Sequence, residues 1–343
     1  MTFNFRRLGL SALVGSALGL ASFGALAQEV NLRVHHFLSD KHNTHAKVLA
    51  PWAEKIEKES DGRIKMTIFP RMQLGGKPPQ LMDQVRDGVA DVVWTLPGYT
   101  AGRYPRIAAF ELPFMVSNAE ATSQALQEYY EKHAKEEFAD VKPLWFHTHA
   151  RGVIHTREKQ IKTAADFDGM KLRAPNRGIG TAMEAMGAAS VFMPVPALPE
   201  ALSKGVVDGA VIPWEIVPPL KVQDLAPNHT ETPGERGLYT AVFVIAMNKA
   251  KYDALPDDLK KIIDDNSGLA LAKSTGKIWD DSEATGLKVV NDKGNPIHQM
   301  ADSEVAIMKE KTRPVIDKWI ADLGDDGQAL YDDANALLDK YSN

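Results

Sequence analysis

Arg173 is the residue whose type and position point most directly to binding chemistry. It lies near the end of DFDGMKLRAP (166–175), where apolar residues alternate as in a half-buried strand that Pro175 ends. A guanidinium is permanently charged, and its two parallel N–H donors match the two oxygens of a carboxylate. The position predicts either a clamp for a ligand carboxylate or an ordinary strand-end arginine, solvated or paired with Asp168.

Histidines form a second group that could do chemistry, and they lie in two clusters. His42 and His45 are three residues apart and could share one helical face, as zinc ligands do. The acidic residues or further histidines that would complete a zinc shell are not evident, so we predict no metal and no cofactor. A zinc-binding protein stays an alternative. The clustered histidines are His35, His36, His42 and His45, and then His147, His149 and His155.

Catalysis is not indicated by any motif. The chain has no cysteine, and neither a GxSxG nor an HExxH pattern occurs in it. No pair of carboxylates stands out at a strand end. We therefore expect a binding protein rather than an enzyme.

The elements that must position these side chains read as alternating strands and helices. Strands are predicted at 30–34, 64–68 and 91–96, with helices at 44–60 and 79–87 between them. A β-α-β-α-β order predicts the α/β class, with a mostly parallel sheet wrapped by helices.

An internal echo indicates that this unit is used twice. RDGVADVVW (86–94) and SKGVVDGAV (203–211) each combine a helix end, a glycine, a valine, an aspartate and an apolar strand. Ligands collect beyond the carboxyl ends of parallel strands, so two such ends facing each other would form a cleft.

The chain length of 343 residues is typical of two domains. We predict domain I from residues 28–148 plus about 242–280, and domain II from 149–241 plus about 281–343. Residues 256–290 are strongly helical, although Gly268 and Gly276 punctuate them, and this length indicates a helix spanning both domains. Several crossings between the domains would make a hinge.

The N-terminus predicts export. Arg6 and Arg7 precede an apolar stretch (8–23), and Ala25-Leu26-Ala27 matches a signal-peptidase site, so we expect residues 1–27 to be a signal peptide cleaved after Ala27. The choice between Sec and twin-arginine export stays open. No other apolar run is long enough to insert into a membrane.

Composition narrows the compartment and the partners. An exported chain without cysteine carries neither a lipid anchor nor a disulfide, which fits a Gram-negative periplasm. A net charge of −5 without a basic stripe makes nucleic acid an unsuitable partner.

Five motifs together resemble those of one family. They occur in the order FPRMQLGG (69–76), VRDGVADVVW (85–94), FELPFM (110–115), DFDGMKLRAP (166–175) and SKGVVDGAVIPW (203–214). The mature chain is similar throughout to the DctP-type substrate-binding proteins of tripartite ATP-independent periplasmic (TRAP) transporters. The resemblance implies a two-domain periplasmic-binding-protein fold, domain closure on a small carboxylate and delivery to a TRAP membrane permease. We expect a monomer; the binding protein of an ATP-driven (ABC-type) importer is the alternative.

The resemblance also implies roles for particular residues. Arg173 matches the arginine that binds the ligand carboxylate in the family. Arg151 matches a second arginine that often approaches the same ligand, although a salt bridge between the domains would also explain it. Further candidates could line the pocket or simply pack in the core; Asn176 could instead cap the following helix. These candidates are Trp214, Glu215, Tyr99, Phe37, His36 and Asn176.

The ligand class follows from where the chain departs from the sialic-acid-type branch of the family. That branch has Glu where this chain has Gly76, and QEN where this chain has AVI (210–212). The polar network for a sugar acid is therefore weakened. We predict an aromatic acid of the hydroxybenzoate type or a short branched hydroxy acid of the pantoate type.

Overall fold

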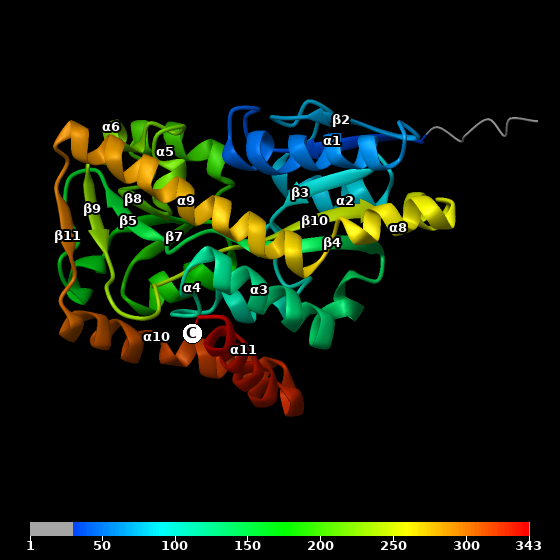
Figure 1. Cartoon of the computed structure of the whole chain (residues 1–343). Coiled ribbons are helices and arrows are strands. Elements are labelled where there is room, and N and C mark those ends of the chain that lie inside the picture. The colour runs from blue at the N-terminus through cyan, green and yellow to red at the C-terminus, as the bar shows by residue number, and fades with distance from the viewer. Residues whose placement is uncertain (1–29, 343) are drawn as a thin grey trace, which may run out of the picture.

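The computed structural model describes residues 30–342, and the predicted signal peptide with its cleavage site lies outside the described residues. Two sheets form the centres of two α/β halves (Figure 1). We call the half built on the five-stranded sheet domain I and the half built on the six-stranded sheet domain II. The exact domain bounds stay a prediction.

The sheet of domain I has the order β2-β1-β3-β10-β4. β1 pairs in parallel with β2 and with β3, whereas β10 is antiparallel to both β3 and β4. Every residue of β3 and β10 is buried, as expected for strands covered on both faces. The bounds are Val30–His36 (β1), Ile64–Phe69 (β2), Val92–Thr95 (β3), Val141–Thr148 (β4) and Val242–Asn248 (β10).

The sheet of domain II has the order β11-β9-β5-β8-β6-β7. β6 pairs in parallel with β7 and β8, and β9 with β11, whereas β5 is antiparallel to β8 and β9. The bounds are Val153–Thr156 (β5), Lys171–Ala174 (β6), Ala189–Phe192 (β7), Gly209–Ile212 (β8), Asn228–Glu231 (β9) and Ile297–Gln299 (β11).

The strand that runs against its sheet is, in each domain, the strand that follows a crossing between domains. β5 comes directly after β4 of domain I, and β10 comes directly after β9 of domain II. Each sheet is otherwise parallel in direction, which confirms the predicted mostly parallel architecture. The two crossings bring segments 149–152 and 232–241 to the boundary between the domains.

Helices and short helical turns cover the sheets (Figure 1). The α-helices are Ala50–Glu59 (α1), Leu81–Arg86 (α2), Ala119–Tyr129 (α3), Arg177–Ala185 (α4), Leu198–Ser203 (α5), Val222–Leu225 (α6), Lys249–Asp253 (α7), Asp257–Asp265 (α8), Leu269–Lys293 (α9), Asp302–Asp322 (α10) and Gly327–Ser342 (α11). The 3-10 and π turns are Thr44–Leu49 (η1), Pro78–Gln80 (η2), Pro97–Tyr99 (η3), Ile107–Glu111 (η4), Tyr130–Ala134 (η5), Lys135–Phe138 (η6), Ala164–Phe167 (η7), Val195–Ala197 (η8), Trp214–Ile216 (η9) and Gly324–Asp326 (η10).

The long helical segment predicted at 256–290 is divided into α8 and α9. Gly268 separates them because its φ of +75° lies in the left-handed region that favours glycine. Gly276 does not interrupt α9: a Cβ there would lie 2.4 Å from the Ala119 carbonyl oxygen, so this glycine permits close packing on α3. α9 runs diagonally past both domains, which confirms the predicted spanning helix (Figure 1).

The internal echo is a real structural repeat. Asp91 accepts a hydrogen bond from the Arg33 backbone N–H at 2.8 Å and returns one to the Arg33 carbonyl at 2.9 Å. Asp208 makes the same pair with Lys171, at 2.8 and 2.7 Å. In both domains the aspartate thus joins the entry of one strand to its parallel neighbour.

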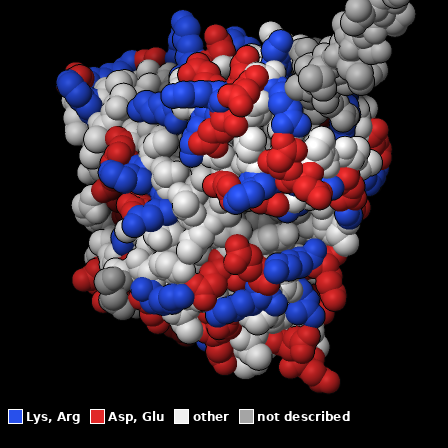
Figure 2. Space-filling model, turned by 45° about the vertical axis from the view of Figure 1, so that its right-hand side comes forward, with Lys and Arg blue, Asp and Glu red and all other residues white. Residues whose placement is uncertain are grey.

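The surface seen in Figure 2 intersperses basic and acidic side chains. Along the helices of the described chain, many lysines and aspartates pair four residues apart, as Lys277 does with Asp281 and Lys318 with Asp322. The charges on this face therefore do not build a broad positive field of the kind that binds nucleic acid.

Candidate functional site

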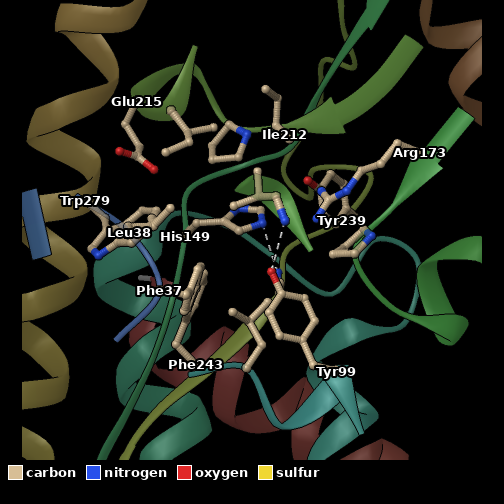
Figure 3. A pocket seen from close by; sticks show the side chains of 16 residues that line it. Phe37, Leu38, Tyr99, His149, Arg173, Ile212, Glu215, Tyr239, Phe243 and Trp279 are labelled. Carbon is tan, nitrogen blue, oxygen red and sulfur yellow. Dashed lines mark hydrogen bonds between the residues drawn. The ribbon is translucent and has the colours of Figure 1, made fainter. Parts of the chain in front are cut away.

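A cavity lies between the two domains, at the carboxyl ends of β3, β6 and β8 (Figure 3). Its wall is mostly apolar and aromatic, and Phe37, Leu38, Tyr99, Phe243 and Trp279 contribute to it. Among the described residues lining it, the carboxylate and guanidinium groups belong to Glu215 and Arg173.

Arg173 lies in the buried end of β6 and is 2% exposed. Its Nε–H donates to the Met193 carbonyl oxygen at 2.9 Å, and the guanidinium also interacts with the Tyr99 hydroxyl. Burial lowers the pKa of Arg173, and the nearby Tyr99 and Tyr239 oppose this shift. Within residues 30–342 no carboxylate forms an ion pair with Arg173, Asp168 included, so its charge faces the cavity without an acidic partner.

Domain I contributes aromatic rings to the opposite wall. Phe37 stacks on Trp94 with ring centroids 5.0 Å apart and meets Tyr99 edge-on at 5.8 Å. The Tyr99 hydroxyl accepts a hydrogen bond from the Val195 backbone N–H at 3.3 Å, which joins domain I to domain II (Figure 3). Burial raises the pKa of Tyr99, so this hydroxyl keeps its proton.

Glu215 follows β8 in η9 and is 8% exposed. Its Oε2 lies 3.3 Å from Nε2 of His42, although neither that nitrogen nor Glu215 Oε1 has a hydrogen bond in the described structure. Figure 3 shows the Glu215 carboxylate on the side of Leu38 and Trp279, across the cavity from Arg173. The two charged groups therefore mark opposite ends of the cavity.

Helix α9 holds this arrangement together. Asp280 accepts hydrogen bonds from the backbone N–H groups at the start of α3, both at 2.8 Å. Glu283 accepts from the backbone N–H groups of Trp214 and Glu215 at 3.1 and 2.9 Å. Burial raises the pKa of Glu283 to about 8, although these hydrogen bonds oppose the shift. Helix α9 thus binds the start of α3 in domain I, binds η9 of domain II and places Trp279 in the wall of the cavity.

Close packing of α9 on η9 also depends on Gly286. A Cβ at this position would lie 1.9 Å from the Trp214 carbonyl oxygen, so any side chain would displace η9. The position of Glu215 therefore depends on a glycine in a distant helix.

Several residues of the cavity wall were not among the predicted ligand-binding residues. They include Leu38, His149, Tyr239, Phe243 and Trp279. His149 and Tyr239 lie in the two crossing segments, and their proximity to a predicted domain boundary was the available signal. Trp279 carries no such signal, because only the packing of α9 brings it to the cavity.

His149 contributes a neutral ring. Its Nδ1–H donates to the Ala150 carbonyl, and its Nε2 accepts from the Ala241 backbone N–H at 3.1 Å. Burial and the nearby Arg173 lower the pKa of His149 to about 4. Both ring nitrogens are thus occupied, and the cation at this end of the cavity is Arg173.

The structure brings Phe37, Tyr99, Arg173 and Glu215 of the predicted set to the cavity, and it places Arg151 and Trp214 elsewhere. The Arg151 guanidinium donates to the carbonyl oxygens of Ser117 and Gly234, both at 2.6 Å, and to that of Glu235 at 2.7 Å. The Trp214 indole N–H donates to Glu231 at 2.7 Å, outside the cavity. Arg151 and Trp214 thus connect segments near the domain boundary.

His36 also lies outside the cavity wall, bonded through Nε2 to Nδ1 of His45 at 2.8 Å. Burial lowers the pKa of His36 to about 3. Among residues 30–342, no group of three or more histidine and acidic side chains is placed to hold a metal ion. The zinc alternative therefore gains no support from the described residues.

Asn176 caps α4, because its side-chain oxygen accepts from the Ile179 backbone N–H at 3.0 Å. Its side chain also interacts with Glu111 of domain I, whose pKa burial raises to about 7. Gly98 lies between them: a Cβ there would be 2.8 Å from the Asn176 amide nitrogen and 3.0 Å from a Glu111 oxygen. This is a tight contact between the two domains beside the cavity.

A buried cation in an apolar cavity between two α/β domains defines a class, the two-domain solute-binding proteins. A family model described as bacterial extracellular solute-binding protein, family 7 (DctP), matches residues 34–322, and the chain belongs to this family. This family comprises periplasmic solute-binding proteins of TRAP transporters. The membership therefore favours the TRAP class over the alternative, the binding protein of an ATP-driven importer.

Solved structures of high similarity support this membership. A TRAP solute-binding protein from an unidentified microbe of a marine metagenome, described as specific for aromatic acid ligands and solved with 3-hydroxybenzoate, is 51% identical, with a TM-score of 0.90 over 92% of this chain and 100% of that chain. One from Rhodoferax ferrireducens, solved with copurified benzoate, is 47% identical, with a TM-score of 0.89 over 91% and 98%. One from Bordetella bronchiseptica, solved with mandelate, is 29% identical, with a TM-score of 0.84 over 91% and 99%.

The helices of residues 30–342 include none with the length and apolarity needed to cross a membrane.

Proposed function

We propose that this protein captures a small aromatic carboxylic acid in the periplasm and delivers it to a TRAP membrane permease. Arg173 binds the carboxylate through its two parallel donors. The aromatic wall of domain I receives the ring.

The observation that carries this proposal is that Arg173 is buried and no carboxylate of the described residues forms an ion pair with it. Its side chain is 2% exposed, and its charge has no acidic partner among residues 30–342. An uncompensated buried charge costs several kcal/mol, so the site favours an anion that supplies the missing charge. A carboxylate meets this need with the fork geometry of the guanidinium.

The aromatic ligand class rests on the rest of the cavity wall. Phe37, Tyr99, Phe243 and Trp279 offer ring faces and edges, which prefer stacked or edge-to-face neighbours. The relatives solved with 3-hydroxybenzoate and benzoate are 51% and 47% identical to this chain. A short branched hydroxy acid of the pantoate type is the second candidate and belongs in the same test.

Capture proceeds by domain closure on the ligand. A ligand that contacts both domains stabilises the closed form, whereas one that contacts a single domain does not shift the equilibrium. The contacts of Tyr99 with Val195 and of Gly98 with Asn176 lie where the domains meet. Closure excludes water, which strengthens the ion pair at Arg173.

A ligand screen tests the proposal. Mature protein is unfolded and refolded to remove carried-over ligand, and its thermal midpoint is measured with benzoate, hydroxybenzoates, mandelate, pantoate, dicarboxylates and sugar acids. A ligand at about one hundred times its dissociation constant adds roughly 2.7 kcal/mol of stability. We expect aromatic acids to raise the midpoint most; stabilisation by a sugar acid alone would overturn the proposal.

Delivery to the permease needs a separate test. Uptake of the identified acid by cells carrying this protein and its permease should stop when the ion gradient is collapsed while ATP is maintained. Uptake that follows ATP instead would contradict the TRAP mechanism. We expect the protein to act as a monomer, which sedimentation with and without ligand checks.

A further inference from the structure

The end of the cavity opposite Arg173 contains a buried acceptor that the carboxylate clamp does not use. Glu215 is 8% exposed and lines the cavity, yet its Oε1 has no hydrogen bond in the described structure. A buried acceptor without a partner is costly, and native structures rarely leave one unexplained. A carboxylate that lines a binding cavity and keeps an unused acceptor points to a donor on the ligand.

His42 lies beside this carboxylate. Its Nδ1 is within 3.2 Å of the Thr44 backbone N–H, and its Nε2 faces Glu215, with Oε2 at 3.3 Å. The pair is close, yet Nε2 has no hydrogen bond in the described structure. The Glu215 carboxylate can therefore accept a further hydrogen bond.

Two further contacts fix the positions of Glu215 and His42. The backbone N–H of Glu215 donates to Glu283 of α9 at 2.9 Å, and the His42 ring stacks on Trp94 of domain I at 5.6 Å. Glu215 comes from domain II and His42 from the segment after β1 of domain I, so the pair spans the boundary. A ligand group bound there would contact both halves, as closure requires.

We propose that Glu215, oriented by His42, binds a hydrogen-bond donor on the ligand remote from its carboxylate, so that the preferred ligand is a ring-hydroxylated aromatic acid. This inference rests on the proposed function, because it assumes that Arg173 receives the carboxylate. A hydroxyl donates to the Glu215 carboxylate, which lies across the cavity from Arg173 (Figure 3). Hydrogen bonds with an ionised acceptor are about twice as strong as neutral ones, which gives the site its discrimination.

The first experiment uses the unaltered protein and ligands matched in size. Calorimetry compares 3- and 4-hydroxybenzoate with 3- and 4-methylbenzoate, which fill similar space but cannot donate. We expect one of the two hydroxy acids to bind about 10- to 100-fold more tightly than its methyl partner, the range of a charge-assisted hydrogen bond. Equal affinities in both pairs would overturn the inference while leaving the aromatic-acid proposal standing.

The second experiment removes the acceptor. In Glu215→Gln the advantage of the hydroxy acid should fall to about threefold or less, because the neutral amide is a weaker acceptor. In Glu215→Leu it should vanish, and the methyl acid should bind at least as tightly as before. His42→Gln should reduce the advantage without abolishing binding of the methyl acid.

Ile216→Val is the matched control, because Ile216 is the next residue and lines the same cavity without a polar group. It should change the affinities of hydroxy and methyl acids equally and leave their ratio intact. An unchanged ratio in a folded Glu215→Gln protein would refute the role of Glu215. If no aromatic acid binds the unaltered protein, the proposed function itself is wrong.

Discussion

The two domains use the same strand–helix unit but place different chemistry at its end. In domain I, β3 leads to Leu96 and Tyr99, whose contributions to the cavity are apolar or aromatic. In domain II, β6 carries Arg173 near its carboxyl end, and β8 leads to Glu215. The repeat therefore supplies two similar scaffolds. The residues at and beyond the strand ends differ, so that domain I contributes apolar groups to the cavity and domain II contributes charged ones.

In the proposed function, this division separates recognition from closure. The charged groups of domain II would then specify which groups a ligand must carry and where. Domain I would contribute apolar surface that gains free energy only when the domains meet around the ligand. Changes in domain II should therefore alter which ligand binds, whereas changes at the domain I contact should weaken all ligands together.

The largest expected effect comes from Arg173. Arg173→Ala should weaken binding of every carboxylate by about 2–5 kcal/mol, the range for truncating one partner of a buried charge pair. Arg173→Lys should also bind poorly, because an ammonium lacks the planar fork. Calorimetry measures both. Lys171→Ala, on the same strand but exposed, should bind as the unaltered protein does; wild-type affinity in Arg173→Ala would contradict the clamp.

Buried histidines in both domains predict sensitivity to acid. Burial lowers the pKa of His147 in domain I to about 3 and that of His229 in domain II to about 4. Below pH 6.5 these histidines therefore bind protons in the unfolded chain but stay neutral in the folded protein. Each such group removes stability as pH falls toward its folded pKa, by about 1.4 kcal/mol per pH unit.

Urea unfolding of the ligand-free protein between pH 7 and pH 4.5 measures this loss. His229→Gln should flatten the decline by about one proton's contribution, although it also removes a contact with Asn295 at neutral pH. An unchanged slope in this variant would show that His229 titrates normally in the folded protein. The raised pKa values of Glu111 and Glu283 act in the opposite sense, because they cost stability as pH rises from 4.5 toward about 7 and 8.

The repeated aspartates test how equivalent the two units are. Asp91 is 1% exposed and also forms an ion pair with Arg33, whereas Asp208 is only partly buried. Asp91→Asn should destabilise the protein by about 2 kcal/mol and Asp208→Asn by about 1 kcal/mol or less, because a buried charged partner loses more. Urea unfolding gives both values. Equal losses would mean that the shared backbone hydrogen bonds, rather than burial, set the cost.

The smallest effect is expected at the contact between the domains. Gly98→Ala introduces a Cβ 2.8 Å from the Asn176 amide nitrogen, so the side chains must shift before the domains can meet. Affinity should fall about tenfold, or about 1.4 kcal/mol, for all aromatic acids alike. The exposed neighbour Ala101 gives the control Ala101→Ser, which should bind normally. A change in ligand preference in Gly98→Ala would contradict a purely steric effect on closure.

Much of the fold was predictable because it depends on local patterns. Alternating apolar residues predicted the positions of β1, β2 and β6. The internal echo predicted β3 and β8, together with the glycines that precede them. The long helix was predicted as one segment, and the left-handed Gly268 divides it. Arg173 was identifiable because a strand followed by proline fixes where its side chain emerges.

The remaining cavity residues depended on contacts between distant segments. Trp279 and Glu283 reach the site because Gly286 lets α9 lie against η9, and nothing within α9 itself indicates that neighbour. Arg151 was a reasonable candidate by its type, yet each of its three guanidinium nitrogens donates to a nearby carbonyl group. Hydrogen-bond partners of this kind cannot be read from residue types.

The sequence by itself determined the α/β class, the repeated unit, the export signal as a prediction and a cation at a strand end, because periodicity and turn residues act over short distances. Only the tertiary structure decided that Arg173 has no acidic partner and that Glu215 lies across the cavity from it. Both facts arise where the two domains and one long helix meet, because such packing brings together segments more than one hundred residues apart. The Tyr239 ring shows the same principle over shorter separations in the chain, since it packs against Gly152 and its hydroxyl donates to the Val211 carbonyl.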